Sequence, residues 1–191
     1  MGTRGAKPKR TEPPVWTAEL AYFVGFVAAD GCLYSDGRHL SLVSKDRDLL
    51  EQVQVKMKIS TNIAPHYRSG ERLEKYKAWH LQFSDVGLYR WLISIGITPK
   101  KSKTIQKVDV PDQYFSHFLR GLYDGDGCIY SYWDKRWKDS FMYYVTFASA
   151  SPPFLDWLQQ KIYNLYTLKG HITSCGKGAR ALKFSKHRAR A

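Results

Sequence analysis

The fold is decided by two nearly identical pentads, Asp30-Gly31-Cys32-Leu33-Tyr34 and Asp126-Gly127-Cys128-Ile129-Tyr130, which stand 96 residues apart. Each pentad follows a segment whose apolar residues recur at helical spacing, residues 18–29 in the first case and 114–125 in the second. The pentads therefore mark two copies of an internal repeat, and in each copy a helix ends at an aspartate.

The elements after each pentad repeat in the same order. Alternating apolar residues predict strands at residues 39–45 and 143–150, and each strand is followed by a helix, capped by Asp46 in one copy and by Ser151 in the other. Further strands are predicted at 62–68, 76–84, 171–175 and 179–185, and a last helix at 85–95. The unit is helix, hairpin, helix, hairpin.

This repeat predicts an α+β fold with two pseudo-symmetric αββαββ(α) subdomains that form a saddle of two antiparallel sheets. We expect a basic, flexible N-terminal segment at residues 1–14, a first subdomain at 15–96, a linker at 97–111 and a second subdomain at 112–191. The sequence ends about where the last helix of the second copy would begin. We therefore expect that copy to be clipped and to lack this helix.

The charge of the chain favours a polyanionic partner. Thirty Lys and Arg residues against 17 Asp and Glu give a net charge of +13, with +7 in residues 1–110 and +6 in residues 111–191. A basic tail would concentrate the charge, whereas an even division predicts nucleic-acid binding by both halves. No stretch reaches the roughly 18 apolar residues of a membrane helix, and the N-terminus has no signal-peptide core, so we expect an intracellular protein.

The three cysteines give no metal or disulfide pattern. Cys32, Cys128 and Cys175 form no C-x-x-C pair, which argues against zinc and against a disulfide framework. We interpret them as small buried residues.

The two helices that precede the pentads carry a recognisable motif. Phe23-Val24-Gly25-Phe26-Val27-Ala28-Ala29-Asp30-Gly31 and Leu119-Arg120-Gly121-Leu122-Tyr123-Asp124-Gly125-Asp126-Gly127 resemble the nine-residue LAGLIDADG motif of homing endonucleases. The resemblance covers roughly residues 15–191 and is to the single-chain type with two motifs. It implies a monomer with internal pseudo-twofold symmetry that cuts both strands of a long, pseudo-palindromic DNA site across the minor groove and leaves 3′ overhangs.

The motif also has a direct physical interpretation. Small residues four positions apart on each helix let two helix backbones approach closely, which predicts a helix interface at Gly25, Ala29, Gly121 and Gly125.

The two motif aspartates predict a metal site. Asp30 and Asp126 end their helices, where the helix dipole disfavours a negative charge, and helix pairing brings them together; we expect the following glycines to adopt the left-handed C-cap conformation. A divalent cation relieves this repulsion, and oxygen ligands without His or Cys favour Mg²⁺, or Mn²⁺ in its place. We expect ligands from Asp30 and Asp126 and from the neighbouring positions Ala29 and Gly125.

Other catalytic candidates follow from position in the strands. The resemblance implies basic groups near the scissile phosphates, and the candidates are Lys45 and Lys183, with Gln82 as the repeat partner of Lys183. Strand alternation turns Lys183 and Gln82 away from the core. Ser44 and Ser149 align in the repeat as weaker candidates. Asp124 has no acidic counterpart, since Ala28 holds that position, and we interpret it as structural or solvent-facing.

Basic and polar residues in or beside the hairpins predict the DNA-binding surface, where they reach base edges and phosphates. They are Arg38, His39, Arg68, Arg72, Lys75, Lys77, His80, Lys135, Arg136, Lys138, Lys177 and Arg180. The aromatic residues Tyr130, Tyr132, Trp133 and Trp137 allow either stacking on exposed bases or ordinary packing. The halves differ at these positions, so the DNA site is expected to be only loosely palindromic.

Two alternative functions remain open from the sequence. A non-cleaving relative, either an intron maturase that acts on RNA or a DNA-binding regulator, would keep the charge but would not need both aspartates; a decayed fragment is a variant of this alternative. A basic ribosome-associated or structural protein explains the charge and leaves the paired motif without a purpose.

Overall fold

The computed structural model describes residues 12–67, 78–134, 141–176 and 178–185. The first copy consists of α1 (Ala18–Asp30), β1 (Gly31–Leu33), β2 (His39–Ser44), α2 (Arg47–Lys56), β3 (Ala64–His66), β4 (Ala78–Ser84) and α3 (Val86–Ser94). The second consists of α4 (Phe115–Asp126), β5 (Gly127–Trp133), β6 (Phe141–Ser149), α5 (Pro152–Tyr166), β7 (His171–Gly176) and β8 (Ala179–Ser185). The expected α+β fold with two repeats is confirmed.

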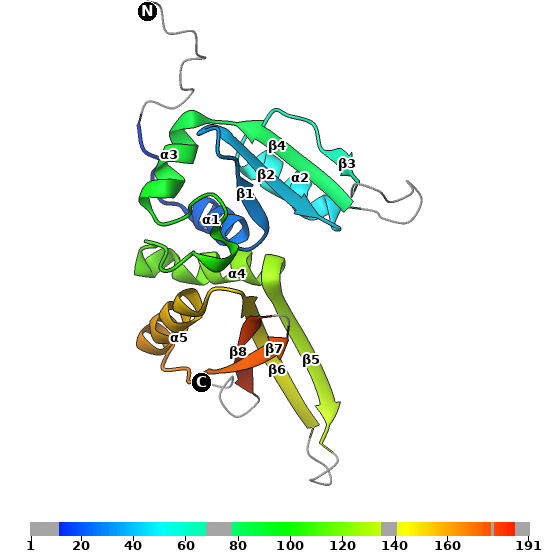
Figure 1. Ribbon diagram of the computed structural model, residues 1–191, viewed down its shortest axis with the longest axis vertical. Coiled ribbons are helices and arrows are strands. Elements are labelled where there is room, and N and C mark those ends of the chain that lie inside the picture. Colours follow the sequence, from blue (N-terminus) through cyan, green and yellow to red (C-terminus); the bar gives the residue numbers. More distant parts are fainter. Residues whose placement is uncertain (1–11, 68–77, 135–140, 177, 186–191) are drawn as a thin grey trace, which may run out of the picture.

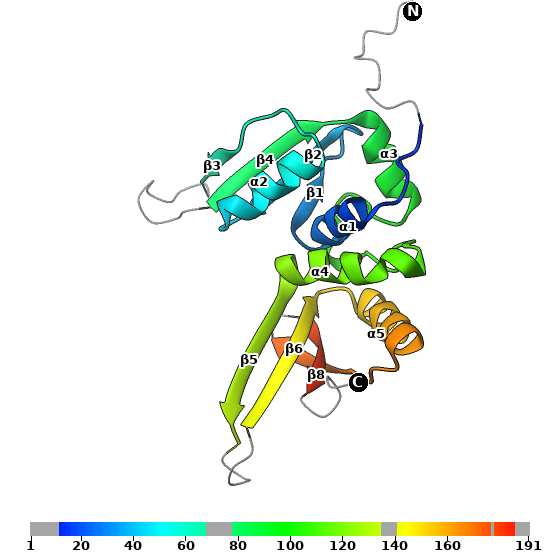
Figure 2. The same cartoon turned by 180° about the vertical axis from the view of Figure 1, so that it is seen from behind.

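Each copy forms one four-stranded antiparallel sheet, ordered β1-β2-β4-β3 in the first and β5-β6-β8-β7 in the second. Helices α1 and α4 lie against each other at the centre, and the two sheets diverge from this pair (Figure 1). The view from behind shows α2 against the first sheet and α5 against the second (Figure 2). In the described part of the second copy no helix follows β8.

The strand register confirms that the two sheets are equivalent. Cys32 pairs with Ser41, which pairs with Gln82 on β4. Cys128 pairs with Thr146, which pairs with Lys183 on β8. Gln82 and Lys183 thus occupy the same position in the two sheets.

The segment between the copies is part of the core. It contains two short 3-10 helices, η1 (Lys101–Lys103) and η2 (Asp112–Tyr114). Its apolar side chains are buried with those of both copies, namely Ile97, Ile105, Val108 and Val110. This segment therefore joins the two copies into one packed body and is not a loose tether.

Both residues predicted as caps stand at the N-caps of their helices, but only Asp46 makes a capping hydrogen bond. The Asp46 carboxylate accepts a hydrogen bond from the backbone N–H of Leu49, and Asp85 does the same for Leu88. Ser151 stands at the N-cap of α5 but makes no capping bond, because its hydroxyl donates to the carbonyl of Ile105. The buried Ser151 therefore fastens the linker to the second copy.

The expectation of left-handed glycines after the motif helices is wrong. Gly31 has φ −79° and ψ 149°, and Gly127 has φ −80° and ψ 154°, which is extended backbone. Each chain passes directly from helix to strand at this point. Glycine is required here for space, since a Cβ on Gly31 would lie 2.6 Å from the Cα of Val27.

Among the described residues, no helix has the length and apolarity needed to cross a lipid bilayer.

Candidate metal and nucleic-acid site

The site is built on the contact between the two motif helices, α1 and α4. A Cβ on Gly25 would lie 2.0 Å from the carbonyl oxygen of Phe118, and one on Gly121 would lie 1.9 Å from that of Tyr22. No side chain fits at these distances, so the two backbones touch directly. Gly125 lies against Ala29 in the same way, with 2.4 Å between the Cβ positions.

A polar contact also crosses the helix pair. The Tyr22 hydroxyl donates a 2.7 Å hydrogen bond to Asp124, and Arg120 and Lys56 lie over the Tyr22 ring. Burial and this hydrogen bond raise the pKa of Tyr22. Asp124 therefore holds the two helices in register and does not belong to the aspartate pair at their ends.

The two motif aspartates lie close enough to interact electrostatically. Burial and, to a smaller extent, the negative charge of Asp30 together raise the pKa of Asp126 to about 6. Burial also raises the pKa of Asp30. The oxygen Oδ2 of Asp30 lies 3.4 Å from the position of a Cβ on Gly125, the residue before Asp126. The tips of both carboxylates remain exposed, so a ligand can reach them.

Sequence reasoning missed a buried lysine beside these carboxylates. The Nζ of Lys101 donates hydrogen bonds to the carbonyls of Gly31 at 2.7 Å and Ala29 at 3.2 Å, on either side of Asp30. The residue is 6% exposed. Burial lowers the pKa of Lys101, while Asp126, Cys32 and Asp30 act in the opposite direction. The carbonyl oxygen of Ala29, which was expected to be a metal ligand, already accepts a hydrogen bond from Lys101. To bind a metal as well, this oxygen would use its second lone pair.

A hollow of about 280 Å³ opens next to this group. It is bounded by the C-terminal ends of α1 and α4, the linker and the end of β6. The lining includes Lys101 and Asp126, and most of its remaining surface belongs to alanines. Of the two motif aspartates only Asp126 is among the lining residues, so the hollow gives space for a hydrated ion on the side of Asp126.

The donor set fits a hard divalent cation. It offers two carboxylates with raised pKa, which gain by sharing a positive charge. Within the described ranges there is no cluster of three or more His, Cys, Asp and Glu side chains of the kind a zinc site requires. Asp30 and Asp126 are therefore the residues that would hold such a cation.

Replacing Asp126 by Asn should stabilise the metal-free protein at neutral pH. In the folded protein the pKa of Asp126 is about 6, above its ordinary value of 3.8. Ionisation of Asp126 therefore destabilises the folded state above pH 6, and this destabilisation disappears below pH 4. The difference is about 3 kcal/mol, reduced to about 1 kcal/mol by the exposure of the carboxylate tip. Thermal unfolding at pH 8 should show a rise in Tm of about 2–4 °C.

The control for this measurement is Asp109→Asn, which changes the net charge equally at an exposed linker position. It should leave Tm unchanged within about 1–2 °C. A lower Tm for Asp126→Asn at pH 8, or a gain that persists at pH 4, would contradict the account of a strained carboxylate.

Replacing Lys101 by Met should raise the pKa of Asp126 above its value of about 6, because the positive charge of Lys101, which lowers this pKa, is removed. Carbon-13 NMR of the aspartate carboxyl groups measures this directly. The neighbouring Lys103 is exposed, so Lys103→Met should leave the titration unchanged. Equal titration curves for both variants would show that Lys101 does not act on the pair.

The other expected catalytic residues lie apart from the carboxylates in the chain but at matching strand positions. Lys183 faces away from the buried Leu182 and Phe184, with its Nζ 6.0 Å from the centre of the Tyr130 ring. Gln82 is exposed at the equivalent position. Lys45 follows β2 immediately and is exposed.

The two aligned serines have a structural explanation. The hydroxyl of Ser44 accepts a 3.1 Å hydrogen bond from the N–H of Asp46, and Ser149 accepts the same bond from Ser151. Both serines therefore shape the turn between a strand and the next helix.

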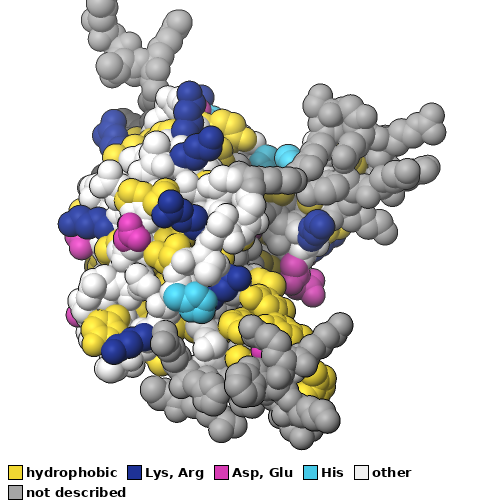
Figure 3. Space-filling model, turned by 60° about the horizontal axis from the view of Figure 1, so that its bottom comes forward, with side chains coloured by type: hydrophobic (Ala, Val, Ile, Leu, Met, Phe, Trp, Pro, Cys, Tyr) yellow, Lys and Arg dark blue, Asp and Glu magenta, His cyan; other side chains and the backbone are white. Residues whose placement is uncertain are grey.

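Part of the expected DNA-binding surface is described. His39 is hydrogen-bonded to Asp36, Arg38 lies 3.6 Å from the same carboxylate, and Arg180 is exposed. Eight expected contacts lie outside the described residues, namely Arg68, Arg72, Lys75, Lys77, Lys135, Arg136, Lys138 and Lys177. Lys and Arg side chains are distributed over the face seen in Figure 3.

The aromatic residues of β5 pack on their neighbours in β6. Tyr130 and Tyr132 stack on Tyr144, with ring centres 5.2 and 6.0 Å apart, and Trp133 tilts against Phe141. Trp137 lies outside the described residues. Because Trp133 is still 65% exposed, packing within the sheet covers only part of this surface.

The interpretation of the cysteines as buried residues is wrong. Cys32, Cys128 and Cys175 are all exposed. Cys32 and Cys128 lie at equivalent strand positions, paired with Ser41 and Thr146.

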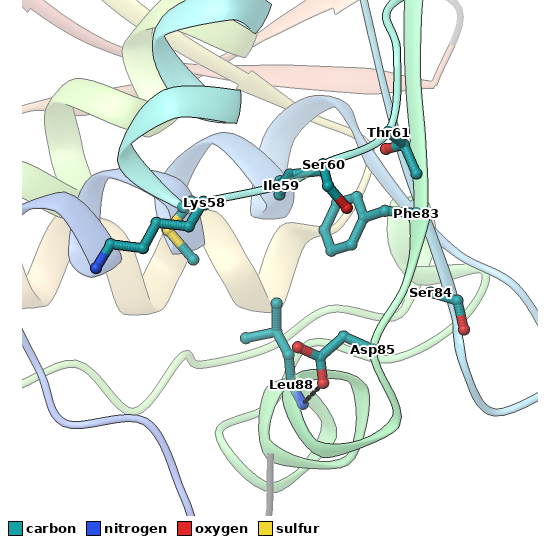
Figure 4. A pocket seen from close by; sticks show the side chains of 9 residues that line it. Lys58, Ile59, Ser60, Thr61, Phe83, Ser84, Asp85 and Leu88 are labelled. Atoms are coloured by element: carbon teal, nitrogen blue, oxygen red, sulfur yellow. Dashed lines mark hydrogen bonds between the residues drawn. The ribbon is translucent and has the colours of Figure 1, made fainter. Parts of the chain in front are cut away.

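A second pocket, of about 290 Å³, lies elsewhere on the first copy (Figure 4). Its floor is formed by Phe83 and Leu88 and its rim by Lys58, Ser60 and Asp85, whose carboxylate points to the N–H of Leu88. It contains neither motif aspartate and forms no part of the candidate site.

Comparison with known proteins agrees with this architecture. Residues 17–92 match the model of a LAGLIDADG-like domain. A search of curated proteins gives no match. The chain is similar in structure to the homing endonuclease I-WcaI bound to its DNA recognition sequence, with a TM-score of 0.65 and 12% identity over 95% of this chain and 84% of that one.

Two further solved structures show the same fold. I-DmoI in complex with DNA and Mn has a TM-score of 0.54 and 15% identity, over 87% of this chain and 89% of that one. Full-length DUF199/WhiA from Thermatoga maritima has a TM-score of 0.57 and 15% identity over 90% of this chain. The present chain spans 52%, about half, of that protein's length.

The fold and the paired helices define the class of two-repeat proteins in which helix-end aspartates meet at a pseudo-twofold axis. The resemblance to the LAGLIDADG homing endonucleases is confirmed at the level of the fold: residues 17–92 match the model of a LAGLIDADG-like domain, and the chain has the two-subdomain fold of I-WcaI and I-DmoI.

Proposed function

We propose that this protein is a site-specific endonuclease that binds double-stranded DNA across its two sheets and hydrolyses phosphodiesters at Asp30 and Asp126. The observation that carries the proposal is the placement of two like-charged carboxylates at touching helix ends, with a pKa of about 6 at Asp126. This placement is explained by a site that receives a cation and a phosphate.

Each candidate residue has a separate role in the proposed reaction. Asp30 and Asp126 would hold Mg²⁺, or Mn²⁺ in its place, and a bound cation would supply activation of water and neutralisation of charge at the phosphate. Lys101 fixes the backbone on both sides of Asp30 and keeps a positive charge beside the carboxylates. We assign Lys45, Lys183 and Gln82 to the approach of the phosphate backbone.

Support for a DNA partner comes from charge and from the fold. The net charge is +13, and the helix-free sheet faces carry polar residues such as His80, Gln82 and Lys183. The similar structures of I-WcaI and I-DmoI are bound to DNA, and that of I-DmoI contains Mn. We extend this mode of binding to the present chain, as a monomer whose site is loosely palindromic.

The test is a cleavage screen in which the purified protein is incubated with a library of randomised DNA duplexes and Mg²⁺. We expect double-strand cuts within one family of related sequences, and none when EDTA replaces Mg²⁺. Recovery of bound duplexes without any cut, under Mg²⁺ and under Mn²⁺, would overturn the proposal.

A second candidate function is nucleic-acid binding without cleavage, either as a DNA-binding regulator or on RNA as a maturase. The structural likeness to WhiA, which has an N-terminal LAGLIDADG domain, favours it alongside the likeness to the endonucleases. Selective binding in the same screen with no metal-dependent cutting would support this second function.

A further inference from the structure

Two histidines lie side by side on the first sheet, far along the strands from the carboxylate pair. His66 on β3 pairs with Ala78, and Ala64 pairs with His80 on β4. His66 and His80 are therefore diagonal neighbours on one face of the sheet. Their ring centres are 5.5 Å apart with 53° between the planes, and both side chains are half-buried.

The surroundings of this pair suit metal ligation. Burial, together with the neighbouring His66, lowers the pKa of His80, so its ring is neutral at pH 7 and offers a lone pair. His39, in contrast, is hydrogen-bonded to Asp36. Two nitrogens bound to one ion at about 2.0–2.1 Å lie roughly 3–3.5 Å apart, so chelation requires the two rings to turn toward each other from the observed 5.5 Å between their centres.

We propose that His66 and His80 form a second metal site, which takes an imidazole-binding cation such as Zn²⁺, Ni²⁺ or Cu²⁺ and not Mg²⁺. Within the described ranges no third His, Cys, Asp or Glu completes a cluster with them. An ion held by these two rings alone would have open positions for water or for an oxygen of a ligand. Its affinity is expected in the Irving–Williams order, with Cu²⁺ strongest.

Strand alternation gives this site a place in the proposed function. His80 and Gln82 lie on the same face of β4, opposite the buried Leu81 and Phe83. On the proposed function, this face meets DNA. An ion held by the two rings would meet a phosphate oxygen there and strengthen duplex binding.

The test is a titration of the full chain, without a histidine tag, with Ni²⁺, observed by NMR of the histidine ring protons. This readout resolves each histidine and excludes confusion with thiols or with the aspartates. We expect the paramagnetic ion to broaden the His66 and His80 signals first, well before those of His39. Equal broadening of all three would overturn the proposal.

Variants provide a second measurement. His66→Gln should reduce the Ni²⁺ sensitivity of the His80 signal at least 10-fold, because one nitrogen of the chelate is lost, while His39→Gln should leave it unchanged. An unchanged His80 response in His66→Gln would overturn the site. Mg²⁺ should leave all three histidine signals unchanged.

The link to DNA is tested separately. One equivalent of Ni²⁺ should tighten binding of a duplex by the parent protein about 3-fold or more and have no such effect on His66→Gln. If the ring titration succeeds and duplex affinity does not change, the metal site stands and its place in the DNA interface is refuted. Neither measurement requires DNA cleavage, so failure of the metal-site proposal can be distinguished from failure of the nuclease proposal.

Discussion

Gly121→Ala should unfold at a markedly lower temperature than the parent protein, although alanine is the better helix former. Intrinsic propensity alone would stabilise α4 by about 1 kcal/mol. The new Cβ, however, would lie 1.9 Å from the carbonyl oxygen of Tyr22 and 2.9 Å from the amide nitrogen of Phe26. Both atoms are backbone, so the two helices must move apart.

The expected cost is about 3–5 kcal/mol, since overpacking against backbone cannot be relieved by a side-chain rotation. For a chain of 191 residues this corresponds to a fall in Tm of about 6–20 °C. Gly25→Ala should behave alike, because its Cβ would lie 2.0 Å from the Phe118 carbonyl. Differential scanning calorimetry checks both.

The matched control is His117→Ala, which places the same alanine on an exposed position of α4. It should change the free energy of unfolding by no more than about 0.5 kcal/mol. The sign of the change in Tm for Gly121→Ala shows whether helix propensity or the clash between the two backbones has the larger effect. A Tm equal to or above that of the parent would mean that the motif helices do not touch through their glycines.

The success of the sequence in predicting this helix pair has a simple physical cause. Glycine at Gly25 and Gly121, in the middle of helices, is costly unless the absence of a side chain is used. Two such glycines at equivalent positions of two helices are best explained if the two helices pack against each other there. Strand alternation was equally informative, since it placed Leu81 and Phe83 in the core and Gln82 outside.

The parts that could not be predicted depend on contacts between distant segments. Lys101 lies 70 residues from Gly31 in sequence, and a lysine in a polar-looking linker is ordinarily solvated. The available signal was weak: Ile97, Ile105 and Val108 around it are apolar and indicate that the linker is buried. The position of Ser151 at the N-cap of α5 is as predicted, but the partner of its hydroxyl could not be predicted for the same reason, because the carbonyl of Ile105 belongs to that linker.

The exposure of the cysteines shows a limit of reasoning from residue type alone. Cysteine is among the most often buried residues, and this favours the core when nothing else is known. Cys32 and Cys128, however, alternate with Leu33 and Ile129 along short strands that leave the motif helices. Since Leu33 is buried against the core, its neighbour Cys32 must face the other way.

Asp30→Asn and Asp126→Asn should each reduce the rate of DNA cleavage at least about 10³-fold, if the cleavage screen yields a substrate. Each variant removes one negative ligand of the cation and leaves an amide of nearly the same shape. Binding of the uncut duplex should persist, because removing a negative charge from a surface that meets phosphates does not oppose association. Single-turnover cleavage and duplex affinity, measured together, separate the two effects.

Asp124→Asn is the informative control for this pair. It removes the same charge two residues before Asp126 on the same helix, but its carboxylate accepts a hydrogen bond from Tyr22 and stands outside the aspartate pair. We expect cleavage within about 10-fold of the parent, with a small loss of stability from the weakened hydrogen bond. If Asp124→Asn were as inactive as Asp126→Asn, cleavage would depend on the total charge of the helix pair. A distinct loss at Asp30 and Asp126 alone would instead locate the reacting phosphate at the two helix ends.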